Sequence, residues 1–324
     1  MKLAVLGTGK IVQEFLPMIQ QVTDVELVAL LSTPRSLDKA KEMQVQYHIQ
    51  EVYTDYETLL ANDSIDTVYV ALPNHLHYQY TKAALLQGKN VICEKPFTLN
   101  AQQLQELIQI ATEKRLILLE AITNQYLNNF LQIKKDLAQL GKIKIVECNY
   151  SQYSSRYDAF KEGKILPAFD PQKGGGALMD INIYNIHFVV GLFGKPEKVQ
   201  YLANVERHID TSGILVLDYG DFKAVCIGAK DSTANIRSVI QGTDGSIEVL
   251  GATNEMPRYE RRSKTEIEAV NANLDKHRMY QEFEKFTEVI DQKDLVFALE
   301  QLNHSLTVMQ VVDQALESAN LHLG

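Results

Sequence analysis

Cysteines in metal-binding spacing are missing from this chain. Its three cysteines, Cys93, Cys148 and Cys226, lie far apart and follow no metal-ligand spacing. An odd number of cysteines in a sequence without a secretory signal is typical of reduced, buried thiols. We therefore expect no cysteine-based metal site and a cytoplasmic location.

Long apolar runs are also missing. The apolar start at residues 3–6 is too short for the core of a signal peptide and runs straight into glycines. No window approaches the roughly 20 apolar residues that a membrane-spanning helix needs. The sequence therefore predicts no membrane partner.

An excess of positive charge is absent as well. Lys and Arg number 32 against 41 Asp and Glu, which gives a formal net charge of −9. A negatively charged protein does not attract nucleic acid unless a local basic patch is present. The densest basic cluster, Arg261-Arg262 with Lys264, is interpreted as a solvated loop. We expect no nucleic-acid partner.

The length of the chain indicates two domains. A chain of 324 residues exceeds one ordinary core, and a hydrophobic content of 45% is typical of globular proteins. We expect a first domain at residues 1–121 and a second at residues 122–324, whose C-terminal helices can pack back on the first. No repeat, low-complexity tract or long linker is present.

Strands and helices alternate through the first half. The apolar runs expected as strands are residues 2–6, 25–31, a short segment near 52, 67–72, 91–93 and 116–119. The helical patterns between them lie at residues 11–19, 37–43, 56–60, 76–86 and 101–113. This alternation predicts an α/β fold with a doubly wound parallel sheet, the Rossmann arrangement.

A glycine turn joins the first strand to the first helix. Glycines allow a tight turn, and the helix N-terminus offers free backbone N–H groups to a pyrophosphate. Val12 replaces the third glycine of the usual G-x-G-x-x-G pattern, so a glycine turn in an unrelated α/β protein is the alternative. The residues predicted to bind a dinucleotide here are Gly7, Thr8, Gly9, Lys10 and Ile11.

The second strand ends in uncharged residues. Ser32 and Thr33 stand where NAD-specific folds carry an acidic side chain for the ribose hydroxyl, and Arg35 follows. An arginine can pair with a 2'-phosphate, so we predict NADP in preference to NAD. The alternative is that Arg35 is a loop arginine facing water.

Loops after two later strands hold further candidates. Pro73-Asn74, after Leu72, marks a loop at a strand's carboxyl end, where a cofactor contact is expected. His75 and His77 diverge at a helix start without a nearby carboxylate, so we predict no metal there. Glu94-Lys95-Pro96 ends another strand, and the proline restricts Lys95 to extended or turn geometry. An ordinary surface pair is the alternative for Glu94 and Lys95.

The second half predicts a different architecture. After a polar helical segment at residues 124–140, strands follow one another with short turns, which is typical of an antiparallel sheet. An open apolar sheet face needs a partner, so we expect a homodimer or homotetramer through this sheet. The expected strands are residues 142–153, 198–206, 213–218, 223–229, 236–241 and 246–250, and two helices at 279–289 and 295–316 end the chain.

A glycine-rich segment interrupts these strands. If the helix that follows Gly174-Gly175-Gly176 is regular, Asp180, Tyr184 and His187 fall at i, i+4 and i+7 and share one face. An acid, a phenol and an imidazole on one stripe favour an active site. A polar stripe facing water or an internal hydrogen-bond chain is the alternative.

These blocks together resemble the glucose-fructose oxidoreductase, inositol dehydrogenase and MocA-like family of NAD(P)-dependent oxidoreductases. The resemblance covers roughly half of the chain. The segments that carry it are Gly7-Thr8-Gly9, residues 65–70 with Pro73-Asn74 and His77, residues 88–91 with Glu94-Lys95-Pro96, residues 174–184, and His304-Ser305-Leu306 with Met309 and Asp313.

The resemblance implies a dinucleotide domain followed by an open, mainly antiparallel sheet that mediates oligomerisation. It implies that Lys95 is catalytic, that Lys95-Pro96 is a cis peptide, that Glu94 and His77 lie at the cofactor, and that Asp180 is an active-site carboxylate. Tyr184 places the chain nearer the branch with an active-site tyrosine, which uses NADP. Thr123-Asn124-Gln125, where relatives often have Trp-x-Arg, and Asn182, where glycine is common, depart from the family pattern.

The predicted chemistry is reversible oxidation of a secondary alcohol in a sugar, polyol or cyclic diol. Tyr184 donates the proton, Lys95 lowers the phenol's pKa from about 10, and Asp180 holds the lysine or a substrate hydroxyl. A non-catalytic NAD(P)-binding sensor on the same fold is the alternative. The expected substrate contacts are His187, Tyr126 and Arg156, with the loop at residues 157–173 and Asn185 as further walls.

Overall fold

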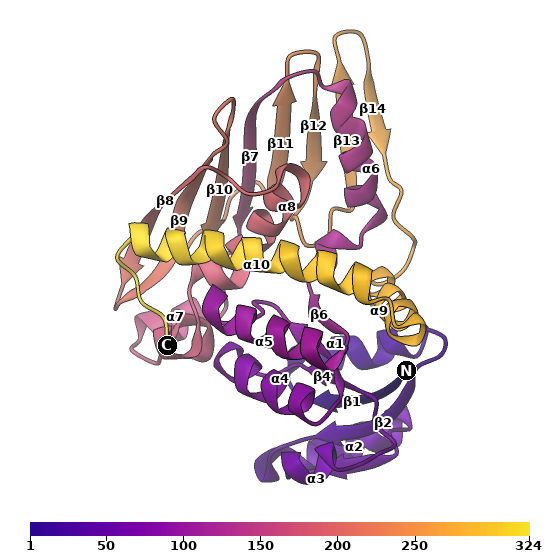
Figure 1. Cartoon of the computed structure of the whole chain (residues 1–324). Helices are drawn as coiled ribbons and strands as arrows, with labels where there is room; N and C mark the ends of the chain where they lie inside the picture. Colours follow the sequence, from indigo (N-terminus) through magenta and orange to yellow (C-terminus); the bar gives the residue numbers. More distant parts are fainter. The chain divides into compact units, whose positions relative to one another are not determined.

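The computed structural model describes all 324 residues and divides them into two compact units (Figure 1). The first unit comprises Met1–Ala121 and Met279–Asn303, and the second comprises Ile122–Arg278 and His304–Gly324. Each unit is built around one sheet.

The first unit holds a six-stranded parallel sheet in the order β3-β2-β1-β4-β5-β6. The order runs outward in both directions from β1 and β4, so the predicted doubly wound Rossmann arrangement is confirmed. The strands are β1 (Lys2–Leu6), β2 (Glu26–Leu31), β3 (Glu51–Tyr53), β4 (Thr67–Val70), β5 (Asn90–Glu94) and β6 (Leu118–Ala121). The helices are α1 (Lys10–Ile19), α2 (Leu37–Tyr47), α3 (Tyr56–Leu60), α4 (His77–Leu86), α5 (Ala101–Lys114) and α9 (Tyr280–Gln292).

Aromatic side chains from distant parts of the sequence fill the core of this unit. Phe283 on α9 lies with its ring centroid 4.7 Å from that of Phe15 on α1 and 5.1 Å from that of Tyr69 on β4. All three rings are fully buried. Helix α9 therefore completes the hydrophobic core of the first unit, although it lies near the end of the chain.

The second unit holds an eight-stranded sheet in the order β14-β13-β12-β11-β7-β10-β9-β8. Its neighbours pair antiparallel except β7 and β10, which are parallel, so the prediction of a mainly antiparallel sheet is confirmed. The strands are β7 (Ile143–Ser151), β8 (Lys198–Glu206), β9 (Ile209–Asp218), β10 (Lys223–Ala229), β11 (Arg237–Gly242), β12 (Gly245–Leu250), β13 (Arg258–Ser263) and β14 (Ile267–Val270). The helices are α6 (Asn128–Asp136), α7 (Tyr157–Lys161), α8 (Ile183–Phe193) and α10 (Leu295–Ser318), whose first residues belong to the first unit.

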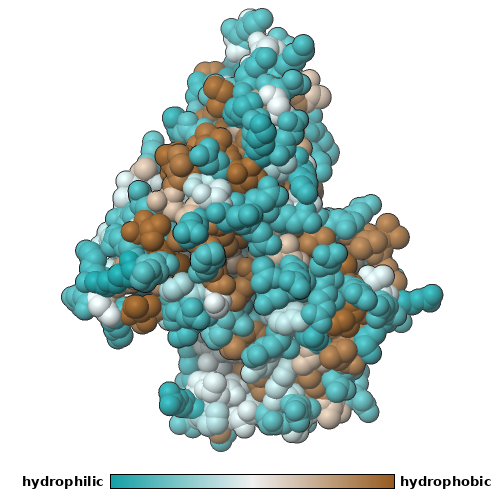
Figure 2. Space-filling view, turned by 60° about the vertical axis from the view of Figure 1, so that its left-hand side comes forward, coloured by the Kyte–Doolittle hydropathy of each residue, from teal (hydrophilic) through white to brown (hydrophobic).

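One face of this sheet is covered and the other is open. Cys148 and Cys226 pair in register on β7 and β10 and are fully buried on the covered face, against which α8 packs. On the opposite face Ile145, Leu202 and Ile214 are 47%, 55% and 42% exposed. Figure 2 shows apolar patches among polar side chains on the surface of the molecule. The open face is therefore partly apolar.

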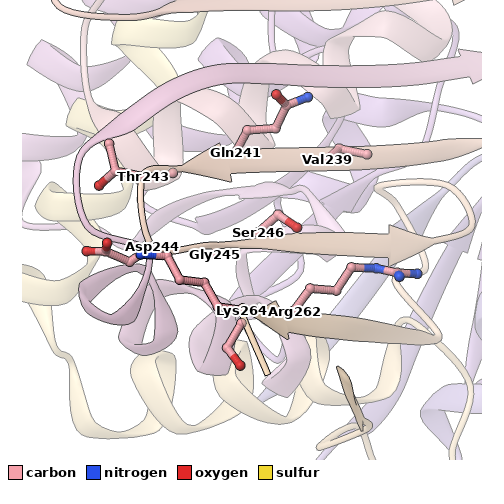
Figure 3. A pocket seen from close by; sticks show the side chains of 10 residues that line it. Val239, Gln241, Thr243, Asp244, Gly245, Ser246, Arg262 and Lys264 are labelled. Carbon is pink, nitrogen blue, oxygen red and sulfur yellow. The ribbon is translucent and has the colours of Figure 1, made fainter. Parts of the chain in front are cut away.

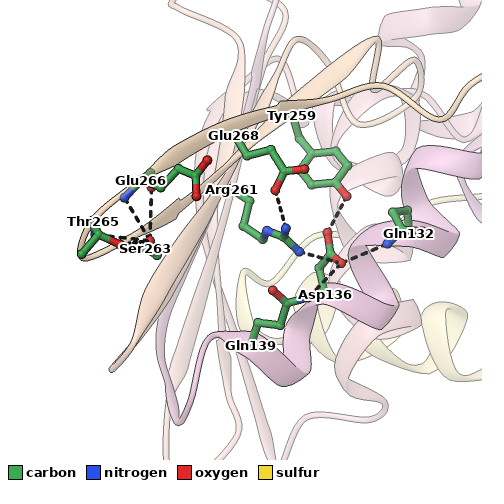
Figure 4. Close-up of polar contacts among 9 residues, drawn as sticks. All are labelled: Gln132, Asp136, Gln139, Tyr259, Arg261, Ser263, Thr265, Glu266 and Glu268. Carbon is green, nitrogen blue, oxygen red and sulfur yellow. Dashed lines mark hydrogen bonds and ion pairs between the residues drawn. The ribbon is translucent and has the colours of Figure 1, made fainter.

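The basic segment around Arg261 is a β-hairpin, which corrects its interpretation as a solvated loop. Arg261 forms ion pairs with Glu268 on β14 and, at 3.2 Å, with Asp136 at the end of α6 (Figure 4). The buried Asp136 also accepts a hydrogen bond from Tyr259 at 2.6 Å. Charged partners thus hold β13 in the sheet. The strand was not predicted because its sequence lacks the apolar alternation that is typical of strands.

The segment Pro171–Phe193 corrects the expectation that no segment is apolar enough to span a membrane. By length and composition alone it qualifies, and 72% of its most apolar window is buried within the protein. A core helix passes the same test. Within this segment, Leu178–Asn182 form a π-helical turn that leads into α8.

Candidate functional site

The glycine turn after β1 has the geometry of a phosphate cradle. Gly7 has a φ of +107°, and a Cβ there would lie 2.8 Å from the carbonyl oxygen of Ala71, so a side chain is excluded. Gly9 caps α1 without a side-chain hydrogen bond, and nothing lies within 4 Å of a Cβ built on it. The first turn of α1 thus follows two bare glycines and has backbone N–H groups without intrahelical partners, which fits a pyrophosphate.

Polar groups with spare bonding capacity follow β2. The Ser32 hydroxyl is buried without a hydrogen-bond partner, and Thr33 forms a capping box with Ser36. Arg35 is exposed on this turn. Lys39 on α2, which the sequence analysis did not single out, donates a 2.8 Å hydrogen bond to the Thr8 carbonyl. A hydroxyl and two cations beside the glycine turn fit the ribose end of a dinucleotide.

His77 lies behind the loop after β4 and contacts two backbone carbonyls. Its Nδ1 lies 2.8 Å from the oxygen of Pro96, and its Nε2 lies 2.8 Å from the oxygen of Leu72. Burial lowers the pKa of this fully buried imidazole. The side chain has no exposed atom for a cofactor, so we revise its predicted role from cofactor contact to positioning of the Lys95–Pro96 turn. Pro73 and Asn74 remain at the surface of that loop.

The turn after β5 is fixed by groups on three neighbouring strands or loops. Glu94 accepts a hydrogen bond from the buried Tyr69 hydroxyl on β4. The Lys95–Pro96 peptide is cis, and Lys95 itself is half-buried. Glu120 on β6 accepts a 3.1 Å hydrogen bond from the N–H of Phe97. The amine of Lys95 thus extends from a rigid support at the carboxyl end of the parallel sheet.

In the second unit, a buried aspartate fixes the start of the glycine-led helix. Asp210 on β9 accepts hydrogen bonds from the N–H of Leu178 at 2.6 Å and from the Tyr201 hydroxyl at 2.7 Å. Burial raises the pKa of Asp210 to about 6. Gly176 has a φ of +103°, and a Cβ there would meet the Asp210 carboxylate at 2.0 Å. Only glycine fits at position 176, next to this anchor.

Asp180 lies within the π-helical turn and forms an ion pair that the sequence did not suggest. Its Oδ2 lies 2.8 Å from the Nζ of Lys230, directly after β10. The Asp180 side chain is 34% exposed, whereas that of Lys230 is 2% exposed. The carboxylate therefore faces outward with a buried ammonium behind it.

Tyr184 lies one turn further, at the start of α8. Its ring centroid is 6.2 Å from that of Tyr150 on β7, and its carbonyl accepts a 2.8 Å hydrogen bond from the side chain of Asn124. Gln125 donates a 3.0 Å bond to the carbonyl of His187. The turn that replaces the Trp-x-Arg of relatives thus supports the backbone of α8, and Tyr126 follows this turn.

His187 does not continue a simple stripe with Asp180 and Tyr184. Its Nδ1 lies 2.9 Å from the Nε2 of His304 on α10, and its side chain is fully buried. The π-helical turn lengthens the spacing after Asp180, so the regular i, i+4, i+7 geometry that we expected is wrong. Substrate binding by His187 stays a prediction.

The two asparagines of this segment face the sheet. Asn182 donates to the Cys226 carbonyl at 3.1 Å, and Asn185 donates to the Ile227 carbonyl at 3.1 Å. Both are fully buried, so Asn185 is not the pocket wall that we expected. Arg156 is exposed at the start of α7, and its role stays a prediction.

A separate pocket of about 430 Å³ lies at the β11–β12 turn (Figure 3). Its lining includes Gln241, Asp244, Arg262 and Lys264. None of the predicted site residues lines it. No group of His, Cys, Asp and Glu side chains in either unit is arranged to hold a metal ion.

Comparison with known proteins decides the family. Residues 1–121 match the family model described as oxidoreductase family, NAD-binding Rossmann fold, and residues 130–248 match the GFO/IDH/MocA C-terminal domain. The chain is 34% identical over 318 residues to scyllo-inositol 2-dehydrogenase (NADP(+)) IolU of Bacillus subtilis (strain 168), covering 97% of this chain and 95% of the relative. The chain belongs to the GFO/IDH/MocA oxidoreductase family.

Two further proteins are similar to this chain. Trans-1,2-dihydrobenzene-1,2-diol dehydrogenase of Xenopus tropicalis is 30% identical over 254 residues, covering 76% of this chain and 74% of the relative. The crystal structure of KijD10, a 3-ketoreductase from Actinomadura kijaniata in complex with TDP-benzene and NADP, has a TM-score of 0.81 at 22% identity and covers 97% of this chain and 96% of that one. This GFO/IDH/MocA protein is therefore an NAD(P)-dependent oxidoreductase that acts on CH–OH groups.

Proposed function

We propose that this protein interconverts a secondary alcohol of a polyol, sugar or cyclic diol and the corresponding carbonyl, with NADP as the cofactor. The observation that carries the proposal is the presence of an outward-facing Asp180, followed one turn later by Tyr184, in a chain that is 34% identical to IolU.

The first unit has the residues to hold the cofactor. Gly7 and Gly9 leave room for the pyrophosphate, and Ser32 offers an unused hydroxyl. Arg35 and Lys39 supply two positive charges for a 2'-phosphate, against the one negative charge of Asp38 in the first turn of α2. When bound, the nicotinamide exchanges a hydride with the substrate carbon.

The residues of the chain move the proton. A secondary alcohol loses its hydroxyl proton as it is oxidised, and the carbonyl gains one in the reverse direction. We assign this transfer to the Tyr184 hydroxyl, with the Lys95 ammonium stabilising the phenolate form. Asp180, which forms an ion pair with Lys230, accepts a hydrogen bond from a substrate hydroxyl and so orients the substrate.

The test uses the two substrates that the names of the relatives suggest. We expect the purified protein to reduce NADP when scyllo-inositol or trans-1,2-dihydrobenzene-1,2-diol is the substrate. The fluorescence of the NADPH that forms measures the rate. Tyr184→Phe should lower kcat by roughly 10²- to 10⁴-fold, the usual cost of a lost general acid. Lys95→Met should lower it at least as far.

Tyr219→Phe serves as the matched control, because Tyr219 bonds the Gly194 carbonyl at a surface turn of the second unit and should keep full activity. NADPH binding without turnover of these alcohols, or of ketoses, aldoses and dicarbonyls in the reverse direction, would instead favour a sensor. Full turnover by Tyr184→Phe would remove the tyrosine from the proposed proton transfer.

We also propose that the protein is cytoplasmic and forms a homodimer or homotetramer through the open face of the second sheet. The exposed Ile145, Leu202 and Ile214 on that face support this proposal, because a second copy would remove them from water.

A further inference from the structure

Lys230 is an unusual residue for the place that it occupies. It follows the central strand β10 and is only 2% exposed, although lysine is almost never fully buried unless it is paired. Its backbone N–H donates to the Thr211 carbonyl at 2.8 Å, and its own carbonyl accepts a bond of 2.8 Å from Ser154. The backbone of Lys230 is therefore fixed on both sides.

The Lys230 ammonium is surrounded by three partners. Nζ lies 2.8 Å from the Asp180 carboxylate, donates to the Ala168 carbonyl at 2.6 Å and lies 4.3 Å from the ring centroid of Phe169. Two hydrogen bonds and a cation–π contact compensate for the loss of water around the charge. Asp180 is the carboxylate that lies within ion-pair distance of this ammonium.

The support for these partners is itself rigid. Phe169 packs with Tyr157, Phe160 and Ile209 in a small hydrophobic cluster, and the stacked rings of Phe160 and Phe169 lie 4.9 Å apart. This cluster is built from the loop that we expected to form a substrate wall. Lys230 thus joins that loop to the π-helical turn that carries Asp180.

We propose that Lys230 is a positioning residue that keeps Asp180 ionised and aimed at the substrate. This inference rests on the proposed function of Asp180. A salt bridge favours the charged form of a carboxylate, and the partly exposed side chain of Asp180 lets that carboxylate meet a substrate hydroxyl. The π-helical turn contributes by placing Asp180 over the end of β10.

Other titratable groups on the packed elements have partners of their own or lie deeper, and the Lys230 charge also lowers the pKa of the buried Asp210. Asp210 on β9 is bonded to Leu178 and Tyr201, Cys226 on β10 is fully buried, and Asp231 is bonded to Thr211 and Ser212. On α8, Tyr184 and His187 follow Asp180. Lys230 is the cation that these elements present to Asp180.

The direct test measures the ionisation of Asp180 without any substrate. Protein labelled with ¹³C at aspartate carboxyls is titrated by NMR, and the Asp180 signal is identified by its loss in Asp180→Asn. We expect Lys230→Met to raise the Asp180 pKa by about 1–3 units, the usual effect of one close opposite charge. Lys230→Arg should restore most of the wild-type Asp180 pKa. An unchanged pKa in Lys230→Met would overturn the proposal.

The kinetic test uses NADP with scyllo-inositol or trans-1,2-dihydrobenzene-1,2-diol. In the pH profile of kcat/KM, Lys230→Met should shift the acidic limb to higher pH by the same number of pH units as the Asp180 pKa. It should also lower kcat/KM about 10-fold or more at neutral pH. In an Asp180→Asn background the same substitution should change kcat/KM by less than about 3-fold, because the two residues act as a unit. Equal losses in both backgrounds would show a merely structural lysine.

Lys89→Met is the matched control. Lys89 is also buried, and it bonds the carbonyls of Asn62 and Ile65 at 3.0 and 2.8 Å in the first unit. The Lys89→Met substitution should destabilise the protein without shifting the acidic limb of the kcat/KM pH profile. NADPH binding identifies the folded fraction of every variant. If Asp180→Asn itself leaves turnover unchanged, the proposed function of Asp180 fails; if Asp180→Asn matters and Lys230→Met does not, only the role of Lys230 fails.

Discussion

The Nδ1 of His187 lies 2.9 Å from the Nε2 of His304, and this contact joins α8 to the part of α10 that belongs to the second unit. One of the two nitrogens must donate and the other accept, so at least one ring is neutral. Burial lowers the pKa of His304 well below the ordinary value, and the neighbouring His187 lowers it further.

We expect this pair to stabilise the second unit as a coupled unit. His187→Leu and His304→Leu should each lower the free energy of unfolding by about 1–3 kcal/mol, because each leaves a buried nitrogen without its partner. The double variant should cost little more than either single one, as measured by urea unfolding. Additive losses would contradict the coupling, and the exposed His322→Leu is the control.

The low pKa of His304 also predicts a pH dependence. The unfolded chain binds a proton near pH 6.5, whereas folded His304 binds it only at lower pH, so the stability is complete above pH 6.5 and is lost as the pH falls. Asp210, with its pKa raised to about 6, acts in the opposite direction. The informative quantity is therefore the difference between wild type and His304→Leu. We expect this difference in the free energy of unfolding to shrink by about 1–2 kcal/mol as the pH falls from 7 to 5, as measured by urea unfolding at each pH.

Cofactor preference tests the charges after β2. Arg35→Ala should weaken NADPH binding about 10- to 100-fold, the usual range for a lost charge-assisted hydrogen bond, and should leave NADH binding unchanged. Lys41→Ala, an exposed lysine on α2, controls for a general loss of positive charge. Tighter binding of NADH than of NADPH by the wild type, unaffected by Arg35→Ala, would reject the 2'-phosphate contact. Fluorescence titration measures the affinities of all three proteins for NADPH and for NADH.

The open sheet face predicts the oligomeric state. Ile214→Asp combined with Leu202→Asp places two charges among its apolar side chains, and we expect the protein to sediment as a monomer. Val45→Asp is the control, since Val45 is 77% exposed on α2 of the first unit. A wild-type protein that already sediments as a monomer at micromolar concentration would contradict the proposed interface.

Much of the fold follows from local patterns in the sequence. The predicted bounds of β1, β8 and β10 equal the observed ones, because each strand coincides with a run that contains apolar residues and is bounded by turn signals. The glycine turn and the Lys95–Pro96 turn were also predictable, since both depend on residues adjacent in sequence. Their backbone conformations need glycine or proline at fixed positions.

The features that escaped prediction depend on partners far along the chain. Arg261 needs Asp136 to hold β13, and Lys230 needs Asp180 and the loop at Ala168 to be buried as a charge. The π-helical turn inserts extra length into a helix without any change in the apolar pattern. A single sequence does not contain these pairings until the sheet register is known.

The parallel pairing of β7 with β10 has a consequence for folding during synthesis on the ribosome. Strand β7 is made early, but its two neighbours in the sheet, β10 and β11, are made much later. Its edges remain unpaired during synthesis, and such edges are templates for aggregation. The second unit closes only when most of the chain has emerged. Chains that stall between residues 151 and 223 should therefore depend on chaperones, whereas full-length chains should not.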